Sequence, residues 1–244
     1  MIYFDLDGTL ADTRADLAAT VNHARSDLGL EPLAVEEVIA NVGLGARYLL
    51  KESVPAGLIG PEKLIEIFMS HYLEHALEKV TLYPGVIDTL QTLAERGWRL
   101  GVNTAKPRQA TEMILDHFGL RRFFGEAVIA GGDGFAMKPA AEPLFACAAK
   151  AGHQVGPGDW MVGDNWTDVG CAAKAGVGSI FCDFGFGVLG DEKPTARARC
   201  FADILDIVAA PAASLAIARS VGGEDDADRD TYSAGGKVEV KHGK

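Results

Sequence analysis

Short apolar runs and longer amphipathic stretches alternate along most of this chain. From residue 82 onward, the runs Trp98–Asn103, Ala127–Ala130, Trp160–Val162 and Gly178–Cys182 have the length and apolar character of strands. The stretches around them have helical spacing over residues 85–96, 107–118, 140–151, 166–175 and 201–210. Because alternating strands and helices build a parallel sheet covered on both faces, the pattern predicts an α/β fold with a Rossmann-like core.

The region after the first apolar run, Ile2–Phe4, has a different pattern. Residues 12–29 carry apolar side chains at helical spacing, and Asp12 or Thr13 is suited to cap this predicted helix. Further helices are predicted over residues 35–41, 46–54 and 61–79. Since no convincing strand interrupts these helices, the sequence predicts an all-helical insert behind the first strand.

These patterns divide the chain into three parts. An α/β core domain is predicted over residues 1–11 and 82–220, and an inserted helical cap domain over residues 12–81. Residues 221–244 are polar and Gly-rich, with an acidic cluster before a basic end. Such a segment buries too little apolar surface to offset its ordering entropy, so a disordered C-terminal tail is predicted there.

Composition narrows the class of protein. The 244 residues carry a formal net charge of -11, which disfavours a nucleic acid or an anionic membrane as a partner. No apolar run approaches membrane-spanning length, and Asp5 and Asp7 interrupt the apolar start too early for a signal peptide. The four cysteines form no C-x-x-C pair, which is typical of reduced thiols in a cytoplasmic protein. A monomer and a homodimer both remain open.

Polar groups follow three of the predicted strands. The first strand runs into Asp5 and Asp7, the second into Thr104, and the fourth into Asp164, while Lys138 stands at the entry to the preceding helix. The carboxyl ends of parallel strands meet at one edge of a sheet, so these side chains are expected to share a pocket. Two crowded carboxylates stay ionised only if a cation sits between them, and otherwise they share a proton.

The carboxylates indicate metal-assisted group transfer. Asp5, Asp164 and the backbone carbonyl of Asp7 offer hard oxygen ligands suited to Mg²⁺, which also binds substrate phosphate. The Asp5 carboxylate could then attack phosphorus in line and give an aspartyl-phosphate. Asp7 could protonate the leaving alcohol and afterwards deprotonate the attacking water.

Three further residues complete the predicted site. The Thr104 hydroxyl and nearby backbone N–H groups could hold a phosphate oxygen, helped by the positive end of the following helix. Lys138 could neutralise a carboxylate and contact another phosphate oxygen. Asp168, one helical turn after Asp164, could orient Lys138 or a metal-bound water. The predicted ligand is therefore a small anionic phosphorylated metabolite.

The same residues carry a family resemblance. Asp5–Thr13 resembles the first motif of the haloacid dehalogenase-like hydrolases, Thr104 the second, Lys138–Pro139 the third, and Gly163–Asp164 with Asp168 the fourth. The four motifs occur in order, so the resemblance extends over about residues 1–210. It implies a Mg²⁺-dependent hydrolase that uses an aspartate nucleophile.

The helical insert is similar to the small cap domain of the phosphoglycolate phosphatase-like branch of that family. The stretches Leu82–Gly85, Thr104–Pro107 and Gly43–Ala46 resemble that branch too, which implies phosphoglycolate phosphatase activity. A phosphosugar phosphatase or phosphomutase of the same architecture is a second hypothesis, and a non-catalytic relative that binds phosphometabolites is a third. A dehalogenase is disfavoured because its reaction needs no leaving-group acid such as Asp7.

Two other motifs and one residue of the insert need interpretation. His71–His75 matches H-x-x-E-H, but no third ligand stands in a suitable context, which favours an ordinary amphipathic helix.

Gly185–Gly190 fits G-x-G-x-x-G, yet it comes late and opens no apolar helix, which favours a flexible loop at the pocket rim. Arg47, one helical turn from Lys51, is a candidate for binding a substrate carboxylate, with a solvated helix face as the alternative.

Overall fold

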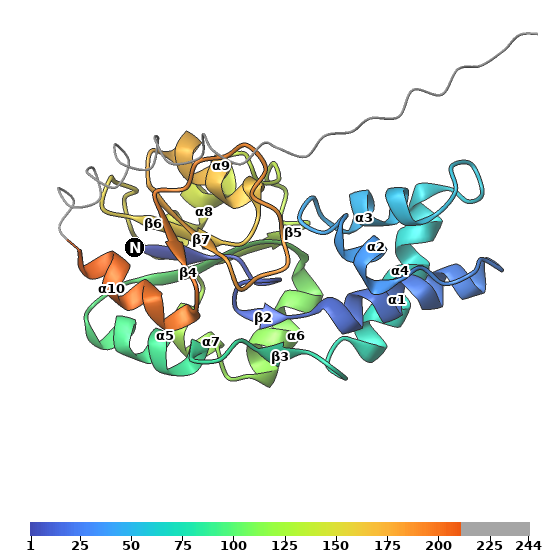
Figure 1. The fold of residues 1–244 in the computed structure, drawn as a ribbon, viewed down its shortest axis with the longest axis horizontal. Helices are drawn as coiled ribbons and strands as arrows, with labels where there is room; N and C mark the ends of the chain where they lie inside the picture. Colours follow the sequence, from blue (N-terminus) through green and yellow to red (C-terminus); the bar gives the residue numbers. More distant parts are fainter. Residues whose placement is uncertain (211–244) are drawn as a thin grey trace, which may run out of the picture. The chain divides into compact units, whose positions relative to one another are not determined.

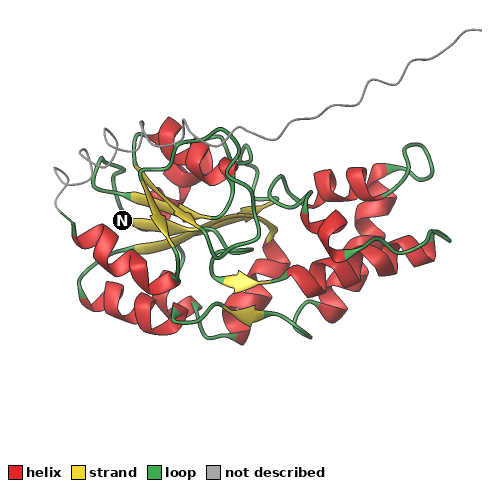
Figure 2. Cartoon of the chain, in the orientation of Figure 1, coloured by secondary structure: helices red, strands yellow, loops and turns green. Residues whose placement is uncertain are grey.

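The computed structural model describes residues 1–210 and contains a parallel six-stranded sheet with helices packed against it (Figures 1 and 2). The strands are β1 (Ile2–Phe4), β4 (Leu100–Pro107), β5 (Val128–Gly131), β6 (Trp160–Gly163), β7 (Gly178–Cys182) and β8 (Ala196–Ala198). Their order is β5-β4-β1-β6-β7-β8, the doubly wound order of Rossmann folds, so the predicted fold class is confirmed. The predicted disordered tail, residues 221–244, lies outside the described residues.

Strand β1 lies at the centre of the sheet because its side chains are apolar on both faces. Ile2, Tyr3 and Phe4 are fully buried, and β1 pairs with β4 on one side and with β6 on the other. The direction in which the chain adds strands reverses between β1 and β6. At such a switch point the strand ends leave a crevice, and here Asp5 and Asp164 follow the two flanking strands.

Helices cover both faces of the sheet. Helices α8 (Glu142–Lys150) and α9 (Trp166–Ala175) lie on one face, and α5 (Val86–Glu95), α6 (Arg108–His117), α7 (Arg121–Phe124) and α10 (Ile204–Ala209) lie on the other (Figure 1). Tyr3 packs in a cluster with Leu144 and Cys171. Phe4, which points the opposite way, stacks on Phe201 with ring centroids 5.8 Å apart. This two-sided burial explains the continuous apolar runs of the strands.

Residues 12–81, called the helical segment here, contain α1 (Arg14–Asp27), α2 (Val35–Ile39), α3 (Ala46–Ser53) and α4 (Pro61–His75). The chain enters and leaves this segment through β2 (Ala11–Asp12) and β3 (Thr81–Leu82), which pair antiparallel. Its helices share an apolar cluster that includes Leu17, Leu50 and Phe68 and extends to Ala110 of α6. The predicted boundary falls at this two-stranded sheet, and a separate cap domain over residues 12–81 stays a prediction.

Several element boundaries differ from the sequence-based prediction. Helix α4 ends at His75 and not at residue 79, where the Lys79 backbone N–H instead donates to Asp16 Oδ1 of α1 at 3.1 Å. Thr13 is the N-cap residue of α1, but its hydroxyl makes no capping hydrogen bond. Helix α7 and strand β8 were not predicted, since α7 is a single turn and β8 is an edge strand without an apolar run. None of the helices within residues 1–210 is both long and apolar enough to cross a membrane.

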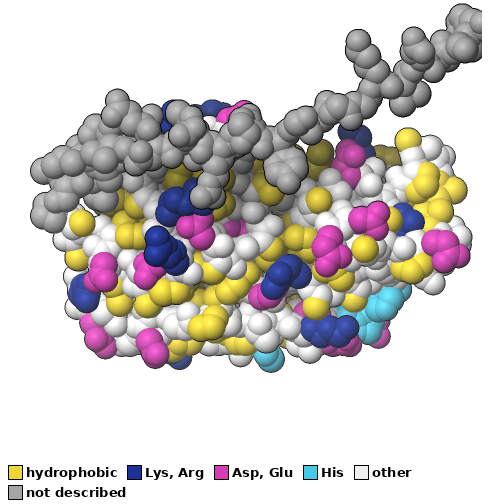
Figure 3. Space-filling view, in the orientation of Figure 1, with side chains coloured by type: hydrophobic (Ala, Val, Ile, Leu, Met, Phe, Trp, Pro, Cys, Tyr) yellow, Lys and Arg dark blue, Asp and Glu magenta, His cyan; other side chains and the backbone are white. Residues whose placement is uncertain are grey.

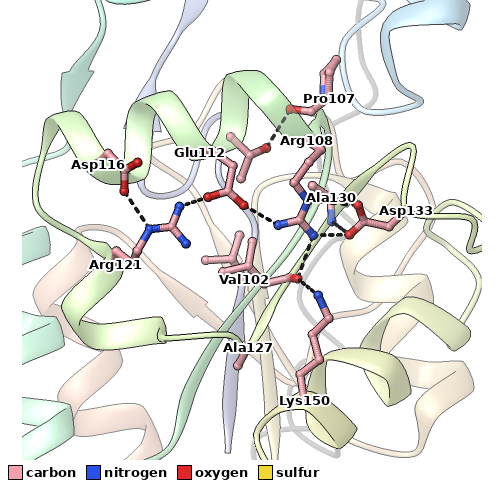
Figure 4. A network of polar contacts seen from close by, with 12 residues as sticks. Val102, Pro107, Arg108, Glu112, Asp116, Arg121, Ala127, Ala130, Asp133 and Lys150 are labelled. Atoms are coloured by element: carbon pink, nitrogen blue, oxygen red, sulfur yellow. Dashed lines mark hydrogen bonds and ion pairs between the residues drawn. The ribbon is translucent and has the colours of Figure 1, made fainter.

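A network of polar contacts fixes the start of α6 beside β5 (Figure 4). Arg108 pairs with Asp133 and, at 2.7 Å, with Glu112, which also pairs with Arg121 of α7. Arg108 Nη2 donates to the Val128 backbone carbonyl of β5 at 2.9 Å. Partly exposed ion pairs contribute about 0–1 kcal/mol each to the free energy of unfolding, so the network adds little to stability. Its contacts join the start of α6 to Val128 of β5 and to Arg121 of α7.

Candidate active site

Asp5 is the first residue after β1, and its carboxylate lies at the carboxyl edge of the sheet. The residue is 7% exposed. Its Oδ1 atom accepts a hydrogen bond from the Leu6 backbone N–H at 2.7 Å and lies 3.0 Å from Lys138 Nζ. These contacts fix the orientation of the carboxylate, which lines a cavity.

Lys138 connects Asp5 to the helix that follows β6. Its ammonium group donates to the Asn103 carbonyl oxygen at 2.8 Å and to Asp168 Oδ1 at 2.6 Å. Asp168 is held in turn, because its Oδ2 accepts the Asn165 backbone N–H at 3.0 Å in the capping box of α9. Burial lowers the pKa of Lys138, but the Asp168 and Asp5 carboxylates raise it by more, so the net shift is upward. The site therefore contains a permanent buried cation beside Asp5.

Asp7 faces a different lysine, Lys106. Asp7 Oδ1 accepts hydrogen bonds from the Thr13 hydroxyl at 2.8 Å and from Lys106 Nζ at 2.7 Å. The same ammonium lies 4.8 Å from the ring centroid of Tyr72 in α4. Burial lowers the pKa of Lys106, whereas Asp7 and Tyr72 raise it, and the net shift is upward. The two aspartates at the end of β1 thus contact different lysines.

The sequence-based prediction did not include Lys106 among the site residues. One signal could have identified it: Thr104 and Lys106 lie two residues apart, and alternate residues of a strand share a face. Strand β4 continues to Pro107, although its register with β5 shifts after Asn103, and both side chains line the cavity. Thr104 itself is buried beside the cavity, and its hydroxyl accepts the Lys106 backbone N–H at 3.2 Å.

Asp164 follows β6 and is held by the loop that fits the G-x-G-x-x-G pattern. Its Oδ2 accepts the backbone N–H groups of Phe186 at 2.9 Å and Gly187 at 2.7 Å. Burial raises the pKa of the Asp164 carboxyl well above its ordinary value, and the negative charges of Asp168 and Asp5 add to the effect. The late glycine-rich stretch therefore binds a carboxylate of this chain.

Two glycines allow the chain to pass close to Asp164. A Cβ atom on Gly8, which has a φ of +80°, would collide with the Asp164 carboxylate. A Cβ atom on Gly185 would collide with Asp164 Cβ and lie 2.5 Å from the Gly8 carbonyl oxygen. Both positions need glycine because of close backbone approach, and Gly8 also needs it for its left-handed conformation.

The cavity that Asp5 lines has a volume of about 40 Å³. Its sheet wall consists of Asp5, Asp7, Thr104, Ala105, Lys106, Pro107, Asp164, Asn165, Phe186 and Gly187. Its helical wall consists of Leu17, Val42, Gly43, Gly45, Ala46, Leu49, Phe68 and Tyr72. At about 10–15 Å³ for each water, the cavity has room for roughly three water molecules.

Arg47 does not belong to this cavity. It lies on α3 and forms two hydrogen bonds of 2.9 Å with the Glu62 carboxylate of α4. Its side chain is 62% exposed. The neighbouring Ala46 lines the cavity in its place. The expectation that Arg47 binds substrate is therefore not supported by its position, which matches the solvated helix face.

Three carboxylates form a candidate cation site. Ligand oxygens of Asp5, Asp164 and Asp168 lie within 4.8 Å of one another. The Asp7 side chain turns instead toward Lys106, which leaves its backbone carbonyl for the contribution predicted from the sequence. Burial and the repulsion from Asp168 and Asp5 raise the pKa of Asp164, and a bound divalent cation would offset both. Buried carboxylate oxygens are the donors that hard cations prefer, so the residues fit such an ion.

Comparisons with known proteins agree with this geometry. Residues 2–182 match the family model of the haloacid dehalogenase-like hydrolases. A phosphoglycolate phosphatase of Agrobacterium fabrum is 38% identical over 191 residues, which cover 75% of this chain and 80% of that protein. A phosphoglycolate phosphatase of Mannheimia succiniciproducens is 34% identical over 224 residues, which cover 85% of this chain and 97% of that protein.

A solved structure has the same fold. The crystal structure of a predicted phosphoglycolate phosphatase from Haemophilus somnus superposes with a TM-score of 0.76 and 28% identity. The match covers 85% of this chain and 96% of that chain. The family model runs from β1 to β7 and so includes every strand that bears a candidate catalytic group. This chain belongs to the haloacid dehalogenase-like hydrolases.

Proposed function

We propose that this chain is a Mg²⁺-dependent phosphatase that hydrolyses a small phosphomonoester, 2-phosphoglycolate above all, through a phosphorylated Asp5. The observation that carries the proposal is the Asp5 carboxylate, which lines a cavity 3.0 Å from Lys138 and beside Asp164. The relatives named phosphoglycolate phosphatase, 38% and 34% identical, support the same substrate.

In the first half-reaction, an Asp5 oxygen forms a bond to phosphorus while the bond from phosphorus to the leaving oxygen breaks. Lys138 and Thr104 hold the phosphate oxygens on which negative charge develops. Asp7 gives its proton to the leaving alkoxide. When bound, Mg²⁺ supplies positive charge that offsets the repulsion between the phosphate and the carboxylates.

In the second half-reaction, water attacks the phosphorus of the phosphorylated Asp5. Asp7, now a carboxylate, takes the proton of that water, and the bond between phosphorus and Asp5 breaks to release inorganic phosphate. The Thr13 hydroxyl contact holds Asp7 in place, and Lys106 contacts Asp7 while Asp7 is a carboxylate. Asp7 then carries the proton that the next turnover needs.

Lys106 supports a substrate that carries a second negative charge. It is the lysine of the sheet wall, and its ionic partner is Asp7. When Asp7 is protonated to act as the acid, Lys106 loses that partner in a buried position. A substrate carboxylate would replace the missing charge, which favours phosphoglycolate over an uncharged phosphomonoester of the same size.

The phosphomutase hypothesis is less well supported. A mutase needs groups on the helical side that bind and reorient a sugar bisphosphate. The helical wall of the described cavity has no charged side chain that could bind a second phosphate.

Steady-state kinetics on 2-phosphoglycolate and ethyl phosphate, with and without Mg²⁺, test the proposal. Ethyl phosphate has the same phosphoester but no carboxylate. One charge-assisted hydrogen bond of about 1.5–3 kcal/mol predicts a ratio of kcat/KM values of about 10–100 in favour of phosphoglycolate. Lys106→Met should bring this ratio toward one, while Lys63→Met, on an exposed surface pair, should leave it unchanged.

The outcomes distinguish the parts of the proposal. If Lys106→Met lowers kcat/KM equally for both substrates, Lys106 only positions Asp7 and does not bind the substrate carboxylate. If the parent enzyme prefers ethyl phosphate, phosphoglycolate is not its substrate. If neither ester is hydrolysed in Mg²⁺, the phosphatase assignment fails.

A further inference from the structure

Three histidines meet on the surface of the helical segment, outside the cavity. His23 comes from α1, and His71 and His75 lie one helical turn apart on α4. One ring nitrogen of each histidine lies within 4.8 Å of the others. The ring centroid of His23 is 5.4 Å from that of His71 and 5.3 Å from that of His75. Figure 3 shows histidine side chains gathered on this part of the surface.

Neighbouring carboxylates hold two of the three rings. Asp27 Oδ2 lies 2.7 Å from His71 Nε2, and Glu78 Oε1 lies 2.7 Å from His75 Nδ1. Histidines that bind a metal through one ring nitrogen almost always give the other N–H to a carboxylate, a carbonyl or water, which fixes the ring orientation. The cluster therefore contains both the ligands and the groups that orient them.

We propose that His23, His71 and His75 bind a divalent transition-metal ion, Zn²⁺ by preference, at a site separate from the carboxylate cluster. Imidazole nitrogens suit Zn²⁺, whereas the oxygens of Asp5 and Asp164 suit Mg²⁺. Three histidines and one water complete the tetrahedral coordination of Zn²⁺. The two sites thus select different ions by ligand chemistry.

Only a small adjustment closes the site around an ion. At Zn–N distances of about 2.0–2.1 Å, tetrahedral ligand nitrogens lie roughly 3.3 Å apart, so the nitrogens must approach by at most about 1.5 Å. The side chains of His71 and His75 are 25% and 28% exposed, which leaves them room to rotate. The H-x-x-E-H pattern offered two ligands on one helix, and the packing of α1 against α4 supplies His23 as the third.

A bound ion would connect the two helices that line much of the helical wall. Helix α1 supplies Leu17 to that wall, and α4 supplies Phe68 and Tyr72. Because the ion binds the folded helix pair and not the separated helices, its binding free energy adds to the stability of the helical segment.

Zn²⁺ titration of the metal-stripped, full-length chain by calorimetry tests this site. Excess Mg²⁺ keeps the carboxylate cluster saturated during the titration. One equivalent of Zn²⁺ is expected to bind to the parent and to His117→Gln, a matched control at an exposed position of α6. Substituting any of the three ligands by Gln should weaken binding by at least about 100-fold, and Asp27→Asn should weaken it by about 10-fold.

Thermal unfolding gives a second readout. Zn²⁺ should raise the Tm of the parent and of His117→Gln and leave the Tm of His23→Gln unchanged. Circular dichroism of each variant without Zn²⁺ reports whether it folds. The proposal is overturned if the parent binds no Zn²⁺ in excess Mg²⁺, or if folded variants of all three histidines bind it as tightly as His117→Gln.

Discussion

The two walls of the cavity differ in chemistry and in how they are held. The sheet wall contributes the charged groups, namely Asp5, Asp7, Lys106 and Asp164. The helical wall contributes no charged side chain among the described residues that line the cavity. The carboxylates are fixed by strand ends and by hydrogen bonds of 2.6–3.0 Å that involve Asp5, Asp7, Asp164 and Asp168.

This difference indicates that the two walls have different roles in the proposed reaction. Charge development at phosphorus needs groups at defined positions, and strand ends supply them because hydrogen bonds to both neighbouring strands fix their backbone. Exclusion of water and limitation of substrate size need only apolar surface, which α1, α3 and α4 provide. Substitutions on the sheet wall should therefore reduce turnover, whereas substitutions on the helical wall should change substrate range.

The largest effect is expected from Asp5→Asn on the sheet wall. The amide cannot act as the nucleophile, so kcat should fall by about 10⁴–10⁶-fold while the fold is kept. Steady-state kinetics with circular dichroism measure this change. Asp88→Asn, at an exposed position of α5, is the control and should keep parental turnover. Parental turnover in Asp5→Asn would show that the sheet wall does not supply the nucleophile through Asp5.

A smaller effect is expected from Gly185→Ala, which acts on the sheet wall without removing a charged group. The added Cβ would collide with Asp164 and disturb the N–H groups that hold its carboxylate. The Mg²⁺ concentration for half-maximal activity should rise about 10–100-fold. Gly156→Ala, where a Cβ would meet open space, is the matched control. An unchanged Mg²⁺ dependence in Gly185→Ala would show that this loop does not orient Asp164.

On the helical wall, Leu49→Ala should broaden the substrate range. Leu49 is 3% exposed and lines the cavity, so truncation enlarges it and also lowers the free energy of unfolding by about 2–5 kcal/mol. The preference for phosphoglycolate over glucose 6-phosphate, as a ratio of kcat/KM values, should narrow about 10-fold.

The control for this prediction is Leu58→Ala in the same segment, where the side chain is 51% exposed. It should leave both substrate preference and stability near the parental values. If Leu49→Ala lowers turnover of phosphoglycolate as strongly as Asp5→Asn does, the helical wall takes part in the chemistry. The assignment of the chemistry to the sheet wall alone is then wrong.

The smallest effect is expected outside both walls, at Glu112→Gln on α6. Its partners Arg108 and Arg121 lie near the surface, so urea unfolding should show a loss of at most about 1 kcal/mol. The loss should shrink at high salt because screening weakens partly exposed pairs. Turnover should not change. A change in kcat would show that the network affects the position of the β4 residues that line the cavity.

The meeting of Asp5 and Asp164 at one edge of the sheet could be predicted from the sequence because each stands where a local pattern ends. Asp5 and Asp164 come directly after apolar runs, and parallel strands bring such positions to one edge of the sheet. The contact between Asp7 and Lys106 could not be predicted in this way. It depends on how far β4 continues and on its register with β1.

The helical segment was predicted less completely for a different reason. Helical spacing shows which residues share a face, but not which face packs against the core. Arg47 was expected at the substrate and instead pairs with Glu62 on the surface. In the same way, the packing of α1 on α4 brings His23 to His71 across a long sequence separation.

In the proposed reaction, Asp5 becomes phosphorylated during every turnover. The most direct measurement is acid quenching of the enzyme during turnover of phosphoglycolate labelled in its phosphoryl group, followed by peptide mapping. Label is expected on the peptide that contains Asp5 in the parent, and no label is expected in Asp5→Asn. Label on another residue, or none in a parent enzyme that is turning over, would contradict the proposed reaction.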